Sequence, residues 1–181
     1  GVQLVVRSSL NNNEGTIVRE EVNMEKMLVS GVAADKNATR IAVIGLKDEP
    51  GIAFHLFNAL AKYNINVDII LQSVGRNGTK DISFTVAEDE ADEAVAIIQK
   101  SFPKSEYNKI DEEKDVAKIS IVGAGMMTHP GVAASMFEAL YDAGVNIKMI
   151  STSEIRVTVL IDEKYTERAL NAVHDKFALG D

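Results

Sequence analysis

The chain has 181 residues, enough for one ordinary domain or two small ones, and its 19 basic and 27 acidic side chains give a formal net charge of −8. An acidic chain repels phosphate backbones, so we expect no nucleic-acid partner. Cysteine is absent from the sequence, which excludes disulfides, thiolate zinc sites and a cysteine nucleophile. No apolar run approaches the roughly 20 residues that span a bilayer, and the start lacks a signal-peptide pattern. We therefore expect a cytoplasmic protein without a membrane partner.

The first part of the chain predicts a leading segment and one complete small domain. We interpret residues 1–26 as an N-terminal strand and linker region, and the apolar segment 27–35 as a further strand. Pro50 suits the first turn of a helix, because its missing N–H needs no partner there. The Asn-Gly pair within 76–79 predicts a hairpin turn. In the order βαββαβ, strands are expected at 40–46, 66–75, 80–87 and 107–111, and helices after Pro50 and at 89–101.

The second part of the chain repeats the first. Residues 50–70 and 130–150 are identical at eight of 21 positions, and at five more they exchange one aliphatic side chain or methionine for another. Outside this stretch, "RIAVIGL" at 40–46 matches "KISIVGA" at 118–124. The second copy predicts strands at 117–123, 146–152 and 154–161 and helices at 130–143 and 163–176. It then ends without a sixth strand.

The segment 27–35 is the candidate for that missing strand. A sheet edge without a partner exposes backbone N–H and C=O groups, which is the physical reason to expect this segment to complete the second copy. We therefore predict an α+β fold of two ferredoxin-like βαββαβ domains, with the first inserted into the second. The first domain would span 40–113, and the second would span 27–39 plus 116–177.

Each copy places a Pro-Gly pair where its first helix is expected to begin. A helix N-terminus offers unpaired N–H groups and a partial positive charge, so it attracts carboxylates. Gly51 and Gly131 have no Cβ and let a ligand approach the backbone. Asp48 precedes the first of these helices, where its carboxylate suits the α-ammonium of an amino acid. The alternative is that Asp48 only caps the helix and Gly51 only packs.

Two longer stretches carry a family resemblance. "LKDEPGIA" through "NINVDIILQSV" and "GAGMMTHPGVA" through "GVNIKMISTSEIRVTV" resemble the paired ACT domains of aspartokinases. The resemblance implies a regulatory part of such a kinase, without catalytic residues or a cofactor. In that family ACT domains pair between chains, with their sheets side by side, and bind end-product amino acids at the interfaces. It therefore implies a homodimer that binds lysine, threonine or both, with a kinase domain or catalytic (alpha) subunit as partner.

The resemblance also implies two effector sites. The threonine-type site would be formed by Asp48, Gly51, Ile52, Ala53 and Gln72, with Asn146 and Ile147 from another chain. The lysine-type site would be formed by Asn66, Val67, Asp68, Thr128, His129, Val132, Ala133, Ser153 and Glu154. Without the resemblance, Gln72 is an exposed strand residue and Asn146 a turn residue. For His129, a contact with the ligand carboxylate and a helix cap are equally good interpretations.

The two copies differ in charge at one position that bears on ligand choice. Asp68 lies in an otherwise apolar strand, and its carboxylate suits an ammonium group, whereas the second copy carries Lys148 there. We infer that the two sites prefer different ligands, or that one is silent. The acidic run at 88–93 is instead expected to be the solvated start of a helix, favoured by the helix dipole.

Other chemistry has little support in the sequence. The three histidines are scattered and cysteine is absent, so we expect no metal site. "GAGMMTHPG" at 123–131 begins like a dinucleotide-binding turn, but Thr128 stands where the third glycine is due. The sequence thus predicts amino-acid sensing without catalysis. The alternatives are an ACT pair that regulates a different enzyme, a small oxidoreductase that uses this turn, and a purely structural subunit spacer.

Overall fold

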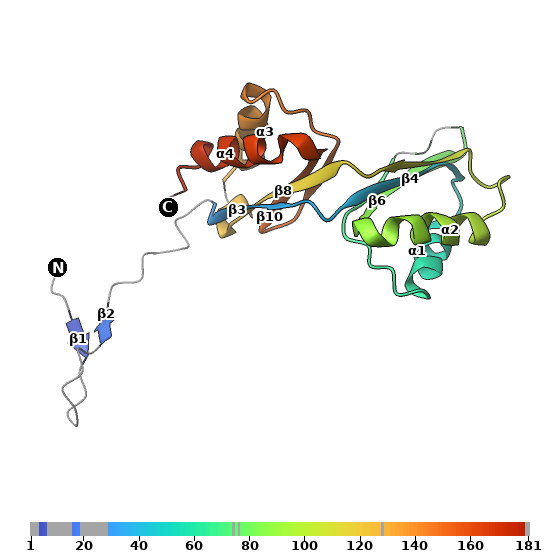
Figure 1. Cartoon of the computed structure of the whole chain (residues 1–181), viewed down its shortest axis with the longest axis horizontal. Coiled ribbons are helices and arrows are strands. Elements are labelled where there is room, and N and C mark those ends of the chain that lie inside the picture. Colours follow the sequence, from blue (N-terminus) through green and yellow to red (C-terminus); the bar gives the residue numbers. More distant parts are fainter. Residues whose placement is uncertain are drawn as a thin grey trace.

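The chain forms two domains that lie side by side (Figure 1). The computed structural model describes residues 4–6, 16–18, 29–73, 75, 77–127 and 129–179. Each domain is a four-stranded antiparallel sheet with two helices, and the two helix pairs lie on opposite sides of the molecule in this view. Within the segment predicted as 1–26, β1 (Leu4–Val6) and β2 (Thr16–Val18) pair antiparallel, and the other residues of that segment lie outside the described ones.

The first domain has the predicted order βαββαβ. Its elements are β4 (Thr39–Lys47), α1 (Ile52–Ala61), β5 (Ile70–Gln72), β6 (Thr79–Val86), the 3-10 turn η2 (Glu88–Glu90), α2 (Ala91–Ser101) and β7 (Lys109–Glu113). The strands lie in the order β5-β6-β4-β7. Leu56 and Leu60 of α1 and Ile98 of α2 are buried in one cluster with Phe84 of β6, so the apolar face of each helix covers the sheet.

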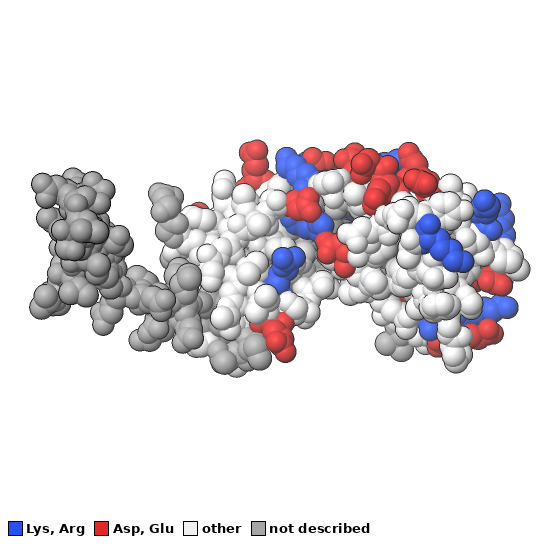
Figure 2. Space-filling view, turned by 90° about the horizontal axis from the view of Figure 1, so that it is seen from below, with Lys and Arg blue, Asp and Glu red and all other residues white. Residues whose placement is uncertain are grey.

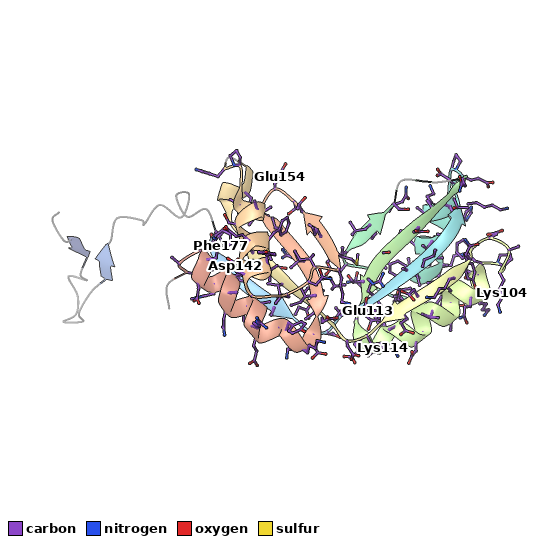
Figure 3. All side chains as sticks on the ribbon, turned by 90° about the horizontal axis from the view of Figure 1, so that it is seen from above. Lys104, Glu113, Lys114, Asp142, Glu154 and Phe177 are labelled. Carbon is purple, nitrogen blue, oxygen red and sulfur yellow. The ribbon has the colours of Figure 1, made fainter. Side chains whose placement is uncertain are left out.

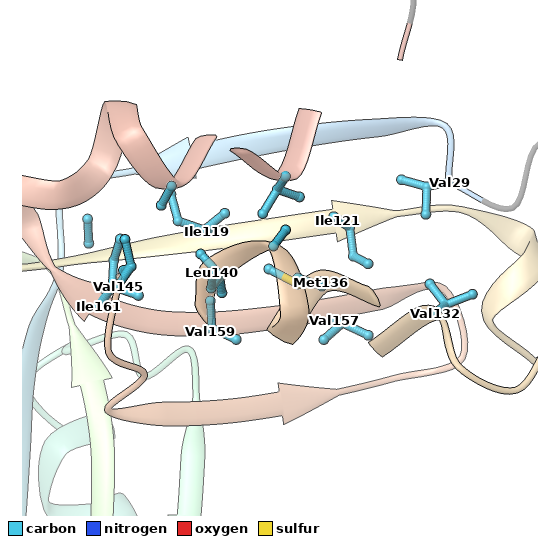
Figure 4. Close-up of a cluster of buried hydrophobic side chains, with 14 of the residues drawn as sticks. Val29, Ile119, Ile121, Val132, Met136, Leu140, Val145, Val157, Val159 and Ile161 are labelled. Atoms are coloured by element: carbon cyan, nitrogen blue, oxygen red, sulfur yellow. The ribbon is translucent and has the colours of Figure 1, made fainter. Parts of the chain in front are cut away.

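The second domain repeats this architecture around its own core (Figure 4). Its elements are β8 (Val116–Val122), the 3-10 turn η3 (Ala124–Met127), α3 (Val132–Asp142), β9 (Met149–Thr152), β10 (Arg156–Asp162), the 3-10 turn η4 (Glu163–Tyr165) and α4 (Thr166–Lys176). The sheet has the order β3-β8-β10-β9. Its edge strand β3 (Gly31–Asp35) precedes the first domain in the chain and pairs antiparallel with β8.

Several predicted boundaries are wrong by a few residues. Pro50 lies before α1 rather than in its first turn, because Gly51 precedes the helix with a φ of 94°, a conformation that glycine adopts readily. The strand predicted from residue 66 begins only at Ile70. The Ile69 carbonyl still accepts from the Thr85 N–H (3.0 Å), but the Ile69 N–H donates to the Thr85 hydroxyl (3.1 Å) rather than to a backbone carbonyl. The strand predicted from residue 146 likewise begins at Met149.

Two chain crossings join the domains and have the same local geometry. The first, 36–38, links β3 to β4, and the second, 114–115, links β7 to β8. The Ala38 N–H donates to the Lys36 carbonyl (2.9 Å), and the Val116 N–H donates to the Lys114 carbonyl (2.8 Å). The crossings are therefore equivalent elements of the repeat.

A small apolar cluster fills the junction between the domains. It consists of Ala38, Ile69, Val116, Met149 and Leu160, all buried. Ile69 and Met149 are equivalent positions of the two copies, as are Ala38 and Val116. Each domain thus presents the same segments to the other, so the junction is approximately two-fold symmetric. Among the helices that the structure describes, none combines the length and apolar character needed to cross a membrane.

Candidate functional site

A groove of about 490 Å³ lies beside the junction, on the face of the second sheet that its helices leave open. Alternate residues of a strand point to opposite faces. Ile119 and Val159 therefore join the core, while Lys118, Ser120 and Thr158 line the groove. The first domain contributes Asp68 and Ile69 to the same lining. The groove is thus built by both domains of one chain.

An ion cluster occupies the end of the groove that faces the first domain. The Lys118 Nζ lies 2.6 Å from Oδ2 of Asp68 and 2.8 Å from Oδ2 of Asp35. Burial alone would lower the pKa of Lys118, but hydrogen bonds to Asp35 and Asp68 outweigh it, and the pKa is raised. Two carboxylates share one ammonium group, so the cluster keeps one net negative charge and suits a further cation.

The rest of the groove carries hydroxyl groups and an arginine. The Ser120 and Thr158 hydroxyls are hydrogen bonded to each other (2.8 Å), and Ser151 and Ser153 lie in the same lining. The guanidinium of Arg156 forms no ion pair with any carboxylate in the part of the chain that the structure describes. The groove therefore offers carboxylates for an ammonium group and a guanidinium for a carboxylate, which are the two charges of an amino acid.

A second set of ion pairs crosses the junction, and here the repeat position equivalent to Asp68 belongs to the second domain. Lys148, which matches Asp68 in the repeat, contacts Glu113 of the first domain and lies 2.9 Å from Oδ1 of Asp162. Glu113 also accepts a hydrogen bond from Arg40 Nε (2.9 Å), and Arg40 matches Lys118 in the repeat. Acidic and basic side chains accordingly gather over the junction (Figure 2), where Figure 3 places Glu113. Asp68 and Lys148 occupy equivalent positions with opposite charges, and each forms an ion pair with the other domain.

These ion pairs predict a specific sensitivity to acid. Burial would raise the pKa of Glu113, but its bonds to Lys148 and Arg40 prevail and lower it, and the hydrogen bond from Lys148 lowers the pKa of Asp162. Carboxyl groups with depressed pKa values stabilise the fold above their unfolded value of about 4 and lose that contribution as the pH falls through the folded value. We expect chemical denaturation to show this loss of stability below about pH 4.5. In Lys148→Met the free energy of unfolding should depend less steeply on pH. An unchanged slope in the variant would contradict this assignment.

The first-domain half of the threonine-type site gathers at the N-terminus of α1. Asp48 Oδ1 lies 2.8 Å from Lys80 Nζ, and the Asp48 N–H donates to the Gly78 carbonyl (2.9 Å). A Cβ on Gly75 would lie 2.4 Å from Oδ2 of Asp48, so glycine there lets this carboxylate approach the hairpin. Asp48 therefore pairs with a lysine, and because α1 has no side-chain cap hydrogen bond, the alternative that Asp48 only caps α1 is wrong.

The other residues of the threonine-type prediction surround this point or lie in the second domain. Gly51, Ile52 and Ala53 form the start of α1, and Gln72 is exposed at the end of β5. Asn146 and Ile147 precede β9 in the second domain. No hydrogen bond or ion pair among the described residues joins these two groups within the chain.

The structure brings only part of the lysine-type site together. Asp68 and Ser153 line the groove, whereas the remaining described members of the set do not. Asn66 and Val67 lie before Asp68. His129 precedes α3, whose first residues are Val132 and Ala133, and Glu154 is exposed between β9 and β10 (Figure 3). Thr128 lies outside the described residues.

Sequence reasoning missed seven charged or polar residues of the groove, which are Asp35, Lys118, Ser120, Ser151, Thr152, Arg156 and Thr158. Lys118 and Ser120 alternate with core residues on β8, and Asp35 and Arg156 lie at exposed strand ends, so all four look like ordinary solvent-facing positions. The one available signal was the repeat itself. By the strand registers Arg156 stands where the first copy has Asp81, so the charge is reversed between the two equivalent strands.

Known proteins agree with this architecture. A family model described as the ACT domain matches residues 41–102 and 119–177, one match in each domain. An aspartokinase of Helicobacter pylori is 44% identical over 98% of the chain, and the match covers 45% of that relative's length. The chain thus spans less than half the length of such relatives.

Solved structures narrow the likeness to one part of these enzymes. The chain is 46% identical to a chain in the crystal structure of aspartokinase alpha and beta subunits, with a TM-score of 0.76, and the match covers 83% of this chain and 99% of that one. For the ligand-free regulatory subunit of aspartate kinase from Thermus thermophilus, the identity is 42%, the TM-score 0.77 and the coverage again 83% and 99%. The chain therefore belongs to the ACT-domain family, as the paired ACT domains of an aspartokinase regulatory region.

Proposed function

We propose that this chain senses end-product amino acids for an aspartokinase, with lysine, threonine or both binding to its ACT domains and favouring an inhibited state of a catalytic partner. The observation that carries the proposal is the groove at the junction, where Asp68 of the first domain and Ser153 of the second line one cavity. The solved complex of aspartokinase alpha and beta subunits supports a catalytic alpha subunit or kinase domain as the partner. Allosteric coupling of this kind amounts to about 1–3 kcal/mol.

The spacing of charges in the groove favours lysine over threonine. Lys118 lies opposite Leu160 in the sheet register, and Arg156 is four residues before Leu160 on the same strand. Four residues of strand correspond to about 14 Å along the backbone. Because the Arg156 side chain is long, its guanidinium can lie closer to Lys118 than this backbone distance. Lysine carries its ε-ammonium at the far end of its side chain from the α-carboxylate, whereas the charges of threonine lie side by side. We assign lysine to the groove and threonine to the site around Asp48.

Reciprocal substitutions test this assignment by calorimetry. Asp68→Asn should weaken lysine binding about tenfold or more, because a hydrogen bond to a charged group is worth about 1.5–3 kcal/mol. It should leave threonine binding unchanged. Asp48→Asn is the matched control and should weaken threonine binding alone. The proposal fails if the wild-type protein binds neither amino acid, and the lysine assignment fails if Asp68→Asn binds lysine as well as the wild type does.

A homodimer is the expected assembly. β5 and β9 are edge strands of their sheets, and each carries an exposed isoleucine at the same position of the repeat, Ile70 and Ile150. An exposed edge offers unpaired backbone groups to another strand, so pairing with a second copy would place the sheets side by side. An effector shared by two chains must strengthen their association. The threonine site would be shared in this way, with Asn146 and Ile147 from the second chain, so sedimentation should show tighter association with threonine, and association that threonine does not change would count against a shared site.

We also infer that the first ACT domain is inserted into the second, with domain limits at 40–113 and at 27–39 plus 116–177. The pairing of β3 with β8 supports the inference, because β3 lies before the first domain in the chain. Hydrogen exchange would test it. Amides of Gly31–Asp35 should lose protection together with those of β8 and β10, and exchange in step with β4 would contradict it.

A further inference from the structure

We infer that Lys118 is an internal competitor for the effector, and that an ammonium ligand must displace it from Asp68. Displacement would break one of the ion pairs that join the two domains. The inference rests on the proposed function, since it takes Asp68 as the residue that receives the ammonium group of the ligand.

The contact between Lys118 and Asp68 already has the chemistry of the expected ligand contact. A primary ammonium group lies 2.6 Å from a carboxylate oxygen, which is the distance of a charge-assisted hydrogen bond. The Asp68 side chain is 49% exposed, so a ligand can reach it from solvent, whereas the Lys118 side chain is only 13% exposed. A lysine ligand would offer Asp68 the same group from the open side of the groove.

Asp35 makes this exchange inexpensive in free energy. It lies directly opposite Lys118 in the pairing of β3 with β8, and its Oδ2 is 2.8 Å from the Lys118 Nζ. Lys118 would therefore keep a carboxylate partner after losing Asp68, and no buried charge would be left unpaired. The cluster would pass from one cation and two carboxylates to two of each, which also removes its net negative charge.

Replacement of Lys118 by the ligand would affect how the two domains are held together, because Lys118 and Asp68 belong to different domains. Asp68 belongs to the first domain, whereas Lys118 and Asp35 belong to the second. The reciprocal pair of Lys148 with Glu113 lies elsewhere in the junction and would remain closed. An effector would thus loosen one side of a symmetric junction and leave the other side closed. This links occupancy of the groove to the relative orientation of the domains.

A double variant distinguishes competition by Lys118 from an effect of the net charge of the ion cluster. Lys118→Met alone leaves two unpaired carboxylates, so it would attract lysine more strongly whatever the mechanism. Lys118→Met combined with Asp35→Asn keeps the wild-type net charge of the cluster and frees Asp68. By calorimetry we expect the double variant to bind lysine about two- to fivefold more tightly than the wild type does, the effect of removing one partly exposed ion pair. Thermal unfolding would verify that it folds.

The distance between the domains supplies a second readout, which can be measured both with the ion cluster intact and in the double variant. The sequence has no cysteine, so Tyr63→Cys and Tyr141→Cys allow one spin label in each domain, at side chains that are 50% and 81% exposed. Labelled protein is diluted with unlabelled protein, so that only distances within one chain are measured. We expect lysine to shift this distance in the otherwise wild-type chain, and the double variant to show the shift without lysine.

The outcomes distinguish the two levels of the proposal. A wild-type protein that binds no lysine would overturn the proposed function and this inference with it. If the wild type binds lysine but the double variant gains no affinity, the inference alone is overturned, and the same holds if lysine binds without changing the distance between the labels. Tighter binding by the double variant together with the shift in distance would establish Lys118 as the competitor.

Discussion

Replacing Phe84 with alanine is expected to lower the free energy of unfolding by about 3–5 kcal/mol. Phe84 lies in β6, is fully buried and packs edge-on against Phe57 of α1, with ring centroids 5.5 Å apart. Its removal would leave a cavity between the sheet and the helix that covers it. Urea denaturation followed by circular dichroism would measure the loss.

Phe54 supplies the control for this substitution within the same domain. It lies on α1 but is 65% exposed, so Phe54→Ala should change the free energy of unfolding by no more than about 0.5 kcal/mol. Equal losses in the two variants would show that Phe84 does not hold the core together. The comparison also bears on function, because α1 begins beside Asp48, and a loosened helix would displace the proposed threonine site.

The second large effect is expected at the junction. Ile69→Asp would place a carboxylate among Val116, Met149 and Leu160, where burial of an unpaired charge costs several kcal/mol. Ile69 belongs to neither domain core, so each domain should remain folded by itself. We therefore expect calorimetric unfolding of the variant to separate into two transitions.

An exposed isoleucine provides the comparison for this variant. Ile155 is 57% exposed in the second domain, and Ile155→Asp should leave the unfolding profile unchanged. If Ile69→Asp unfolds in the same single step as the wild-type protein, the cluster does not couple the domains.

Local patterns predicted most of the regular elements, because each half of the chain contains the core that its own helices cover. The spacing of Ala53, Leu56, Phe57 and Leu60 defines one face of α1, and the structure buries Leu56 and Leu60 on that face. The hairpin turn predicted at the Asn-Gly pair is confirmed by positive φ angles of 52° at Asn77 and 75° at Gly78. The starts of β5 and β9 were wrong, and at β5 the Ile69 N–H donates to the Thr85 hydroxyl, a side-chain contact that no local pattern reveals.

The candidate groove depends on contacts that no local pattern reveals. Lys118 and Asp68 are 50 residues apart and lie in different domains. Sequence alone marks Asp68 as unusual, because it is a charge in an apolar strand, but it does not identify Lys118 as its partner. The mismatch between Asp68 and Lys148 was interpreted as a difference in ligand choice. The structure adds that both side chains bind the opposite domain, so their charges also set how the domains meet.

Because the chain crosses between the domains twice, no single cleavage would release either of them. A cut at 114–115 would place β3 on one fragment and β8 on the other, still held by the ladder from Gly31 opposite Val122 to Asp35 opposite Lys118. A cut at 36–38 would leave the two domains joined through the segment between β7 and β8. Fragments 1–114 and 115–181 should therefore reassemble when mixed, as complementing pieces of one protein rather than as two independent domains.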